Sequence, residues 1–135
     1  MDKERLVRDI YHKGVILCKP DTLLQEVVRV MADTEIHAVI VTEREEEPPV
    51  GVVSHTDAIA HYGEDLTIIQ ARDVMTPHVI SVSEDVTLEE AARKLLESNI
   101  HRLLVVGTDG RPLGILSTTD FIREMRGTRW VWYLD

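Results

Sequence analysis

The chain has 135 residues, is 44% hydrophobic and carries a formal net charge of −9. That length fits one compact domain or two small interlocked halves, and it excludes two independent domains with full cores. The acidic balance argues against nucleic acid as a partner, because neutralising many phosphates requires a cationic face, so any anionic ligand needs a local cluster of positive charge.

The first half of the chain, residues 1–64, predicts a short N-terminal helix and then a strand, a helix, two strands and a helix. The first long helix is marked by four apolar residues at the three-to-four-residue spacing of a half-buried helix: Leu24, Val27, Val28 and Met31. Residues 38–41 are a short apolar run typical of a strand buried on both faces, and the next strand begins near Val50. Residues 56–62 open with Thr-Asp, so this half ends in a strand that leads directly into a helix.

The second half, residues 65–127, predicts the same order of elements. Its long helix has five apolar residues at helical spacing: Leu88, Ala91, Ala92, Leu95 and Leu96. Residues 103–106 predict another strand buried on both faces, Asp109 and Gly110 predict a tight turn, and a further strand begins near Leu113. Residues 119–125 again open with Thr-Asp and predict the last helix.

The two long helices begin differently. Thr87 and Glu90 predict a capping box, in which the hydroxyl and the carboxylate satisfy free backbone amides of the first helical turn. Leu23 stands at the position of that threonine in the first half. We therefore expect the cap of the first long helix to move to Asp21 or Thr22.

The two halves are copies of one unit. A shift of 64 positions aligns residues 8–42 with residues 72–106, and 11 of these 35 pairs are identical. The shift then falls to 63, because one loop is a residue longer in the first copy, which loops tolerate. Neither copy can cover its own apolar faces, so we expect both to pack together about a pseudo-twofold axis. The predicted fold is α/β (α+β), with two β-α-β-β-α repeats in one globule.

Residues 128–135 form an aromatic tail beyond the repeats. The tail holds both tryptophans of the chain, Trp130 and Trp132. Their large side chains predict burial, either against the helices of the same chain or against a second subunit or a client protein. The sequence leaves both interpretations open.

The sequence carries no sign of export or of membrane insertion. No apolar run approaches the roughly 18 residues that span a bilayer, and the start MDKERLVRD lacks the apolar core of a signal peptide. Cys18 is the single cysteine, which excludes an internal disulfide, and its apolar neighbours favour a small core residue over a reactive thiol. We expect a cytoplasmic protein with no membrane partner.

Two segments place hydroxyls and a carboxylate where a strand meets a helix. They are residues 51–57, GVVSHTD, and residues 114–120, GILSTTD. Free backbone amides and the helix dipole favour phosphate at such a junction, and a carboxylate there can accept both hydroxyls of a ribose. The alternative is that four hydroxyl residues merely cap two helices: Ser54, Thr56, Ser117 and Thr119.

The sequence resembles the CBS domain family, whose members occur as tandem pairs. The resemblance extends over residues 8–125 and is carried by DVMTPHVISVSEDVTLEEAARKLLESNIHRLLVV and GILSTTD of the second copy. It implies two clefts between the copies, each able to accept an adenine nucleotide such as AMP, ADP or ATP as a regulatory ligand. It also implies a homodimer and no catalytic cofactor.

The family pattern assigns roles to residues of this chain. Asp57 and Asp120 would hold ribose hydroxyls, and the phosphate or ribose would contact Ser54, Thr56, Ser117 and Thr119. The adenine would be enclosed by residues that enter the first strand of each copy: Ile16, Met75, Thr76, His78 and Ile80. His101 and Arg102 match a basic pair that reaches phosphates, a task that suits the planar fork of an arginine.

The first copy departs from this pattern. Ala38 stands where the second copy has Arg102, and Tyr11-His12-Lys13-Gly14 replaces the Met-Thr-Pro-His of residues 75–78. The two clefts should therefore differ in affinity. We hypothesise that the cleft at Asp57, supplied with Arg102 from the other copy, is the stronger phosphate site.

The sequence favours a ligand-sensing regulatory module that binds adenine nucleotides and signals to a client protein. The alternatives are a structural dimerisation module with degenerate sites and a sensor of an S-adenosylmethionine-type ligand. An enzyme is not expected, because the serine and aspartate candidates occur as duplicate pairs without a distinct third partner, and the six histidines lack metal-ligand spacing.

Overall fold

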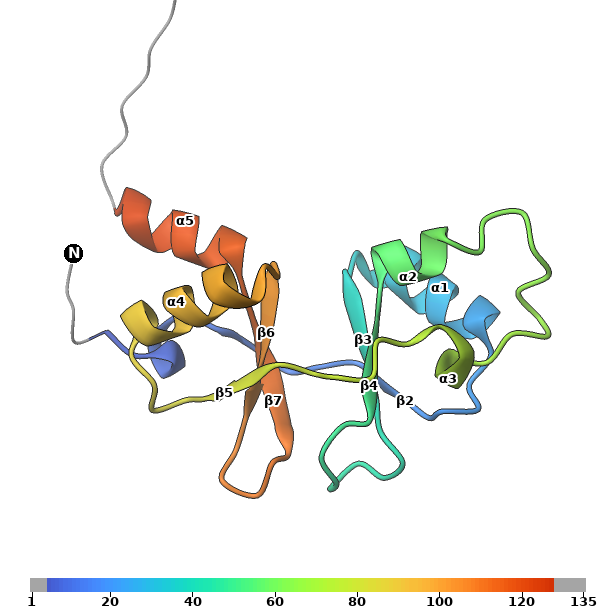
Figure 1. The fold of residues 1–135 in the computed structure, drawn as a ribbon, viewed down its shortest axis with the longest axis horizontal. Helices are drawn as coiled ribbons and strands as arrows, with labels where there is room; N and C mark the ends of the chain where they lie inside the picture. The colour runs from blue at the N-terminus through green and yellow to red at the C-terminus, as the bar shows by residue number, and fades with distance from the viewer. Residues whose placement is uncertain (1–4, 128–135) are drawn as a thin grey trace, which may run out of the picture.

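The structure, a computed structural model, describes residues 5–127, so the tail with Trp130 and Trp132 lies outside the described residues. Figure 1 shows two halves side by side, each with a small sheet and helices. Each half contains the long helix and most of the strands of one predicted repeat, and two segments of the chain pass between the halves. The predicted mixed fold of two β-α-β-β-α repeats is confirmed.

The first repeat forms a three-stranded sheet in the order β2-β3-β4, with β2 parallel and β4 antiparallel to the central β3. Its elements are β2 (Leu17–Cys18), α1 (Leu24–Thr34), β3 (Ala38–Val41), β4 (Gly51–Ser54) and α2 (His55–Ile59). A short helix, α3 (Ala71–Val74), follows before the second repeat. The helix predicted at residues 56–62 corresponds to α2, which is shorter than predicted and ends three residues earlier.

The second repeat forms a four-stranded sheet in the order β1-β7-β6-β5. Its elements are β5 (Ser81–Ser83), α4 (Leu88–Ser98), β6 (Arg102–Val106), β7 (Pro112–Ser117) and α5 (Thr118–Arg126). The edge strand β1 (His12–Lys13) belongs to the first repeat in sequence and pairs antiparallel with β7. The N-terminal helix expected from the sequence is the short 3-10 helix η1 (Val7–Asp9).

The first residues of each repeat, which we call its leading segment, pack on the other repeat; the two leading segments include His12 and Thr76. His12 pairs with Ile115 of β7, and Thr76, at the equivalent position of the second repeat, forms an antiparallel bridge with Val52 of β4. Val7 is correspondingly buried in the core of the second repeat. This exchange joins the two halves and sets the relative position of the residues between them.

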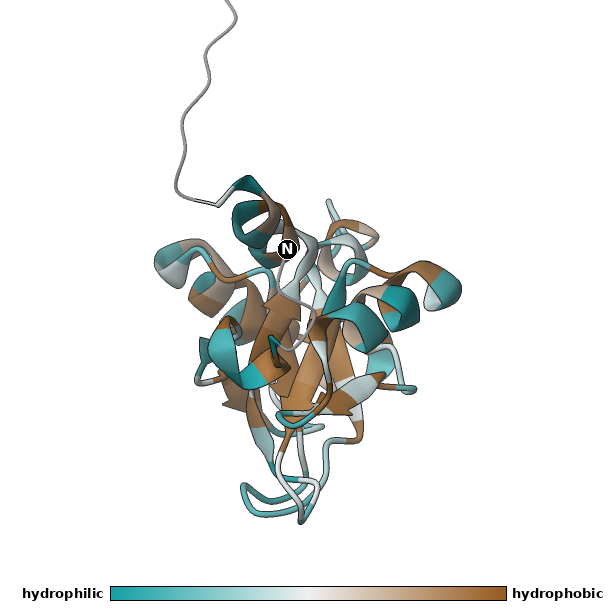
Figure 2. Cartoon of the chain, turned by 90° about the vertical axis from the view of Figure 1, so that its left-hand side faces the viewer, coloured by the Kyte–Doolittle hydropathy of each residue, from teal (hydrophilic) through white to brown (hydrophobic). Residues whose placement is uncertain are grey.

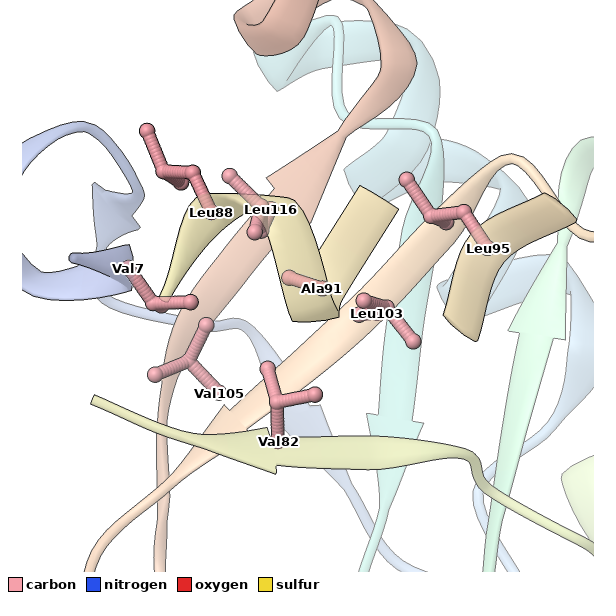
Figure 3. Packing of buried hydrophobic residues seen from close by; sticks show 8 residues of the cluster. All are labelled: Val7, Val82, Leu88, Ala91, Leu95, Leu103, Val105 and Leu116. Atoms are coloured by element: carbon pink, nitrogen blue, oxygen red, sulfur yellow. The ribbon is translucent and has the colours of Figure 1, made fainter. Parts of the chain in front are cut away.

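Two apolar cores lie beneath the helices, one in each half. Figure 3 shows the second-repeat core, in which the buried residues are Val7, Val82, Leu88, Ala91, Leu95, Leu103, Val105 and Leu116. Figure 2 shows that the strands inside the molecule are hydrophobic, whereas the helices around them carry hydrophilic stretches. Fully burying one such valine or leucine is worth about 1.5–3 kcal/mol, so these cores stabilise the sheet positions predicted from the sequence.

Individual predictions of burial agree with this packing except at Leu96, which was expected on the apolar face of α4 and is 81% exposed. All four residues of β3 are buried, as the apolar run indicated. Cys18 is half-buried and packs against the first core, and burial raises the pKa of its thiol to about 11. Between residues 5 and 127, no helix combines the length and the apolar character that crossing a bilayer demands.

The predicted cap of the first long helix is wrong. The N-cap residue of α1 is Leu23, without a side-chain cap, and Thr22 instead accepts a hydrogen bond from the backbone of Lys19. The free amides of Leu24 and Gln25 donate to the carbonyls of Ile69 and Leu66, at 2.8 and 3.2 Å, in the segment that links the repeats. Of the box predicted for α4, the structure shows the Thr87 hydroxyl accepting from the amide of Glu90.

Candidate ligand-binding clefts

Two clefts lie between the repeats, and each is lined by both of them. The larger, of about 770 Å³, includes Ser117 and Thr119 in its lining, and we call it the Ser117 cleft. The smaller, of about 450 Å³, includes Ser54 and Thr56, and we call it the Ser54 cleft. Both volumes fall in the range of small-molecule sites, which commonly lie between structural units.

The two serines end β4 and β7 and start the helices that follow. The Ser54 amide and hydroxyl donate to Asp57 Oδ2 at 2.8 and 2.9 Å. The Ser117 amide and hydroxyl donate to Asp120 Oδ2 at 2.8 and 3.1 Å. Of the hydroxyls predicted to cap these helices, Ser54 does so by accepting from the Asp57 amide at 3.3 Å, and Ser117 is the N-cap residue of α5, but Thr56 and Thr119 lie inside the helices. Capping uses one oxygen of each carboxylate and leaves Oδ1 for other partners.

The second oxygen of each aspartate faces the leading segment of the opposite repeat. His12 Nε2 lies 2.7 Å from Asp120 Oδ1, and the Thr76 hydroxyl donates to Asp57 Oδ1 at 3.3 Å. His12 and Thr76 are 64 residues apart and therefore equivalent in the repeat. Asp120 is only 5% exposed, whereas Asp57 is half-buried. One aspartate is thus enclosed beside a basic ring, and the other has a neutral neighbour and more access to solvent.

The titratable side chains that line the clefts, among residues 5–127, are all basic. The Ser117 cleft is lined by His12, Lys13, His37, His101, Arg102 and Arg123. The Ser54 cleft is lined by His55, His78, His101 and Arg102. In a chain with a net charge of −9, Lys13, Arg102 and Arg123 supply the local positive charge that an anionic ligand requires.

Two of these histidines form a pair across the strand tips of the first repeat. His55 Nε2 lies 3.0 Å from the carbonyl of Ile36, which can only accept, so a neutral His55 carries its proton on Nε2. His37 Nδ1 then donates to His55 Nδ1 at 3.4 Å. Desolvation lowers the pKa of His37, and the charges of Arg102 and His55 lower it further. His37 is therefore mostly neutral at pH 7, in a site that already holds a guanidinium.

The structure brings most of the predicted ligand residues to the clefts. The Ser117 cleft is lined by Ile16, Ser117 and Thr119, and the Ser54 cleft by Ser54, Thr56, Thr76, His78 and Ile80. His101 and Arg102 line both clefts. Within the described range, neither lining includes Asp57, Asp120 or Met75.

Met75 occupies a different place from the one expected for it. Its side chain packs against the core of the first repeat and lies against Gly51, where an added Cβ would stand 2.5 Å from the Met75 sulfur. Ile80, also expected beside the adenine, does line the Ser54 cleft. Apolar contact with a ligand in that cleft therefore falls to Ile80 and its neighbours.

Sequence reasoning missed several basic residues of the clefts. His12 could have been found, because it aligns with Thr76, which was predicted. Arg123 could also have been found, since it stands three residues after Asp120 on α5 and its guanidinium lies 4.0 Å from that carboxylate. His37 could have been found as well, because it aligns with His101, whereas the contact of its ring with His55 is set only by the folded sheet.

Comparison with known proteins gives these clefts a context. The profile of the CBS domain matches residues 7–64 and 71–127. An uncharacterised protein of Methanopyrus kandleri is 27% identical over 120 residues, which are 87% of this chain and 61% of that protein. The inosine-5'-monophosphate dehydrogenase of Methanocaldococcus jannaschii is 31% identical over 118 residues, 87% of this chain and 23% of the enzyme. The chain thus spans less than two thirds of either relative.

The same arrangement of repeats is found in a solved structure. The crystal structure of CBSX2 in complex with AMP has a TM-score of 0.77 and 28% sequence identity to this chain. The likeness covers 90% of this chain and 96% of that one. A likeness of this extent includes both repeats.

Proposed function

The chain belongs to the CBS domain family, with two copies of the domain in tandem, and we propose that it is a regulatory module that binds an adenine nucleotide between them. The observation that carries this proposal is that, within residues 5–127, both cleft linings hold Arg102 and no acidic side chain, beside hydroxyls at the strand tips. Similarity to CBSX2, a protein whose structure contains AMP, supports the adenosine part of the ligand.

Each group of the ligand has a matching surface in the clefts. Phosphates would bind Arg102 and the hydroxyls of Ser54 and Thr56 or of Ser117 and Thr119, because guanidinium and hydroxyl donors suit phosphate oxygens. Apolar side chains such as Ile16 and Ile80 would contact the adenine.

The aspartates supply the ribose contact in this proposal. Asp57 Oδ1 needs to exchange only a long hydrogen bond from Thr76 for ribose hydroxyls. Asp120 Oδ1 can do the same only after His12 moves away from it. A nucleotide that bridges the repeats stabilises the arrangement it binds best, and a client protein would read that shift of population.

Binding can be tested by thermal unfolding and calorimetric titration of the chain with AMP, ADP, ATP and S-adenosylmethionine. We expect at least one adenine nucleotide to raise the melting temperature, since a ligand at 100 times its Kd adds about 2.7 kcal/mol to the free energy of unfolding. Asp57→Ala should reduce this gain. Asp33→Ala, at an exposed position of α1 that lines neither cleft, is the matched control and should not.

Two outcomes would contradict the proposal. One is the absence of any stabilisation or heat of binding with all four compounds at millimolar concentration. The other is conversion of the nucleotide to a product by the purified chain, which would indicate an enzyme in place of a binding module.

A further inference from the structure

The starts of the two central strands form the wall between the clefts. Ala38 begins β3 and pairs with Ser54, and Arg102 begins β6 and pairs with Ser117. The two residues occupy the same position in the repeat, 64 residues apart. Both line both clefts. A fully symmetric module would have two guanidinium groups in this wall, and this chain has one.

Arg102 carries a charge without an acidic partner in the described part of the chain. Several arginines pair with carboxylates, as Arg5 does with Glu124 and Arg93 with Glu89, and no salt bridge within residues 5–127 joins Arg102 to a carboxylate. The side chain is half-buried. A partly desolvated guanidinium among other bases is stabilised by an anion, and its fork can hold one phosphate with two hydrogen bonds.

The charge of Arg102 reaches groups on both sides of the wall. It acts on His37, which lines the Ser117 cleft. His37 in turn contacts His55, which lines the Ser54 cleft. His101, the neighbour of Arg102 in sequence, lines both clefts as well. A phosphate that draws Arg102 and this group toward one cleft removes positive charge from the other.

We propose that Arg102 is a single phosphate-binding group shared by the two clefts, so that a nucleotide in either cleft weakens the binding of a second nucleotide in the other. The inference rests on the proposed function for the adenosine part of the ligand. Adenosine, which has no phosphate, should bind both clefts without this coupling. The sequence had assigned Arg102 to the Asp57 side alone, and its place in both linings is the reason for the wider role.

The test uses variants that leave one cleft open at a time. Thr119→Trp fills the Ser117 cleft, and Thr56→Trp fills the Ser54 cleft; both threonines are exposed, so the larger ring need not enter a core. With AMP in calorimetric titrations, we expect each blocked variant to bind one nucleotide tightly. The unblocked chain should bind the second nucleotide at least about tenfold more weakly than the first, the fold-change for losing one strong charged contact. Adenosine should bind each cleft of the unblocked chain with the same affinity as in the variant whose other cleft is blocked.

Replacing Arg102 shows whether this residue binds phosphate in both clefts or in only one. Arg102→Gln should weaken AMP binding at least about tenfold in both blocked variants and leave adenosine binding unchanged. Ala38→Arg, tested in the unblocked chain, supplies the missing guanidinium and should bring the second AMP step close to the first. Because this comparison needs no blocked variant, it still tests the inference if a blocked variant does not fold.

Three results would overturn the inference. Arg102→Gln could weaken AMP binding in one blocked variant only, or Ala38→Arg could leave the ratio of the two AMP steps unchanged. In either case adenosine and AMP still bind, and the proposed function stands. If neither adenosine nor AMP binds any variant, the proposed function fails together with the inference.

Discussion

At the scale of single residues, His37 is a base held neutral beside a cation. Desolvation lowers its pKa, with Arg102 and His55 adding to the effect. A phosphate in the Ser117 cleft would reverse the balance, because an anion favours the protonated ring. Ligand binding at this residue should therefore take up a proton.

This proton uptake predicts that affinity for AMP rises as pH falls. In the free protein the pKa of His37 lies below its usual 6.5; in the complex the phosphate raises it, so the complex holds more protons than the free protein between these values. Linkage then strengthens binding as the pH falls through the pKa of His37 in the complex toward its lower pKa in the free protein. Titrations across that range should show the trend, and His37→Gln should flatten it. An equal slope in the wild type and His37→Gln would assign the protons to another group.

At the scale of elements, the crossing of each leading segment over the opposite sheet depends on a glycine. A Cβ at Gly114 would collide with the carbonyl oxygen of His12 and stand 2.7 Å from the Tyr11 ring. At the equivalent Gly51 the nearest group is the flexible side chain of Met75. A backbone carbonyl cannot move away from an added Cβ as a long side chain can. An alanine should therefore be tolerated less well at Gly114 than at Gly51.

We expect Gly114→Ala to destabilise the fold by about 1–3 kcal/mol, the usual cost of forcing extra atoms into a packed site. Gly51→Ala, its partner in the other repeat, should cost less because Met75 can change rotamer. Urea unfolding of both variants measures the difference. Equal losses would show that β1 does not hold His12 rigidly against β7.

The two long helices end on a left-handed residue, which is Glu35 in α1 and Asn99 in α4. Their φ angles are 57° and 52°. Asparagine tolerates this region, whereas the Cβ of a glutamate is strained in it. The repeat therefore carries the same turn with unequal local cost.

Glu35→Gly should accordingly stabilise the protein by about 1 kcal/mol, because glycine adopts the left-handed conformation without the clash. Asn99→Gly is the matched control and should change stability by less than about 0.5 kcal/mol. Thermal unfolding measures both. A loss of stability in Glu35→Gly would mean that the glutamate side chain makes a contact worth more than the strain.

At the scale of the whole molecule, one edge presents matched apolar side chains. Ile59 on α2 and Ile122 on α5 are 67% and 64% exposed, and they are equivalent positions of the repeat, 63 residues apart. Tyr62 and Met125 form a second exposed pair with the same spacing. Figure 1 shows α2 and α5 on the same edge of the molecule, above the two sheets. A pseudo-twofold patch of this kind suits a second copy of the chain.

The homodimer predicted from the sequence should therefore form through this edge. Ile122→Glu should weaken self-association at least about tenfold, because it places a charge in an apolar contact. Ile68→Glu changes an equally exposed isoleucine in the segment between the repeats and should have no such effect. Sedimentation equilibrium over a range of concentrations measures both. Unchanged association of Ile122→Glu would move the interface elsewhere.

What the sequence alone determined is local or periodic. The 64-residue repeat, the buried strands at 38–41 and 103–106, the apolar faces of α1 and α4, and the serine-aspartate junctions could all be predicted. Each depends on which neighbours along the chain share a face, and the spacing of residues encodes that directly.

Only the tertiary structure decided which segments of one repeat meet the other. It placed His12 on Asp120, directed the carbonyls of the linking segment to the start of α1, and brought Arg102 into both clefts. His12 and Asp120 are more than a hundred residues apart, and no local preference sets such a contact. It arises because two incomplete cores must close against each other, and the geometry of that closure belongs to the assembled pair of repeats.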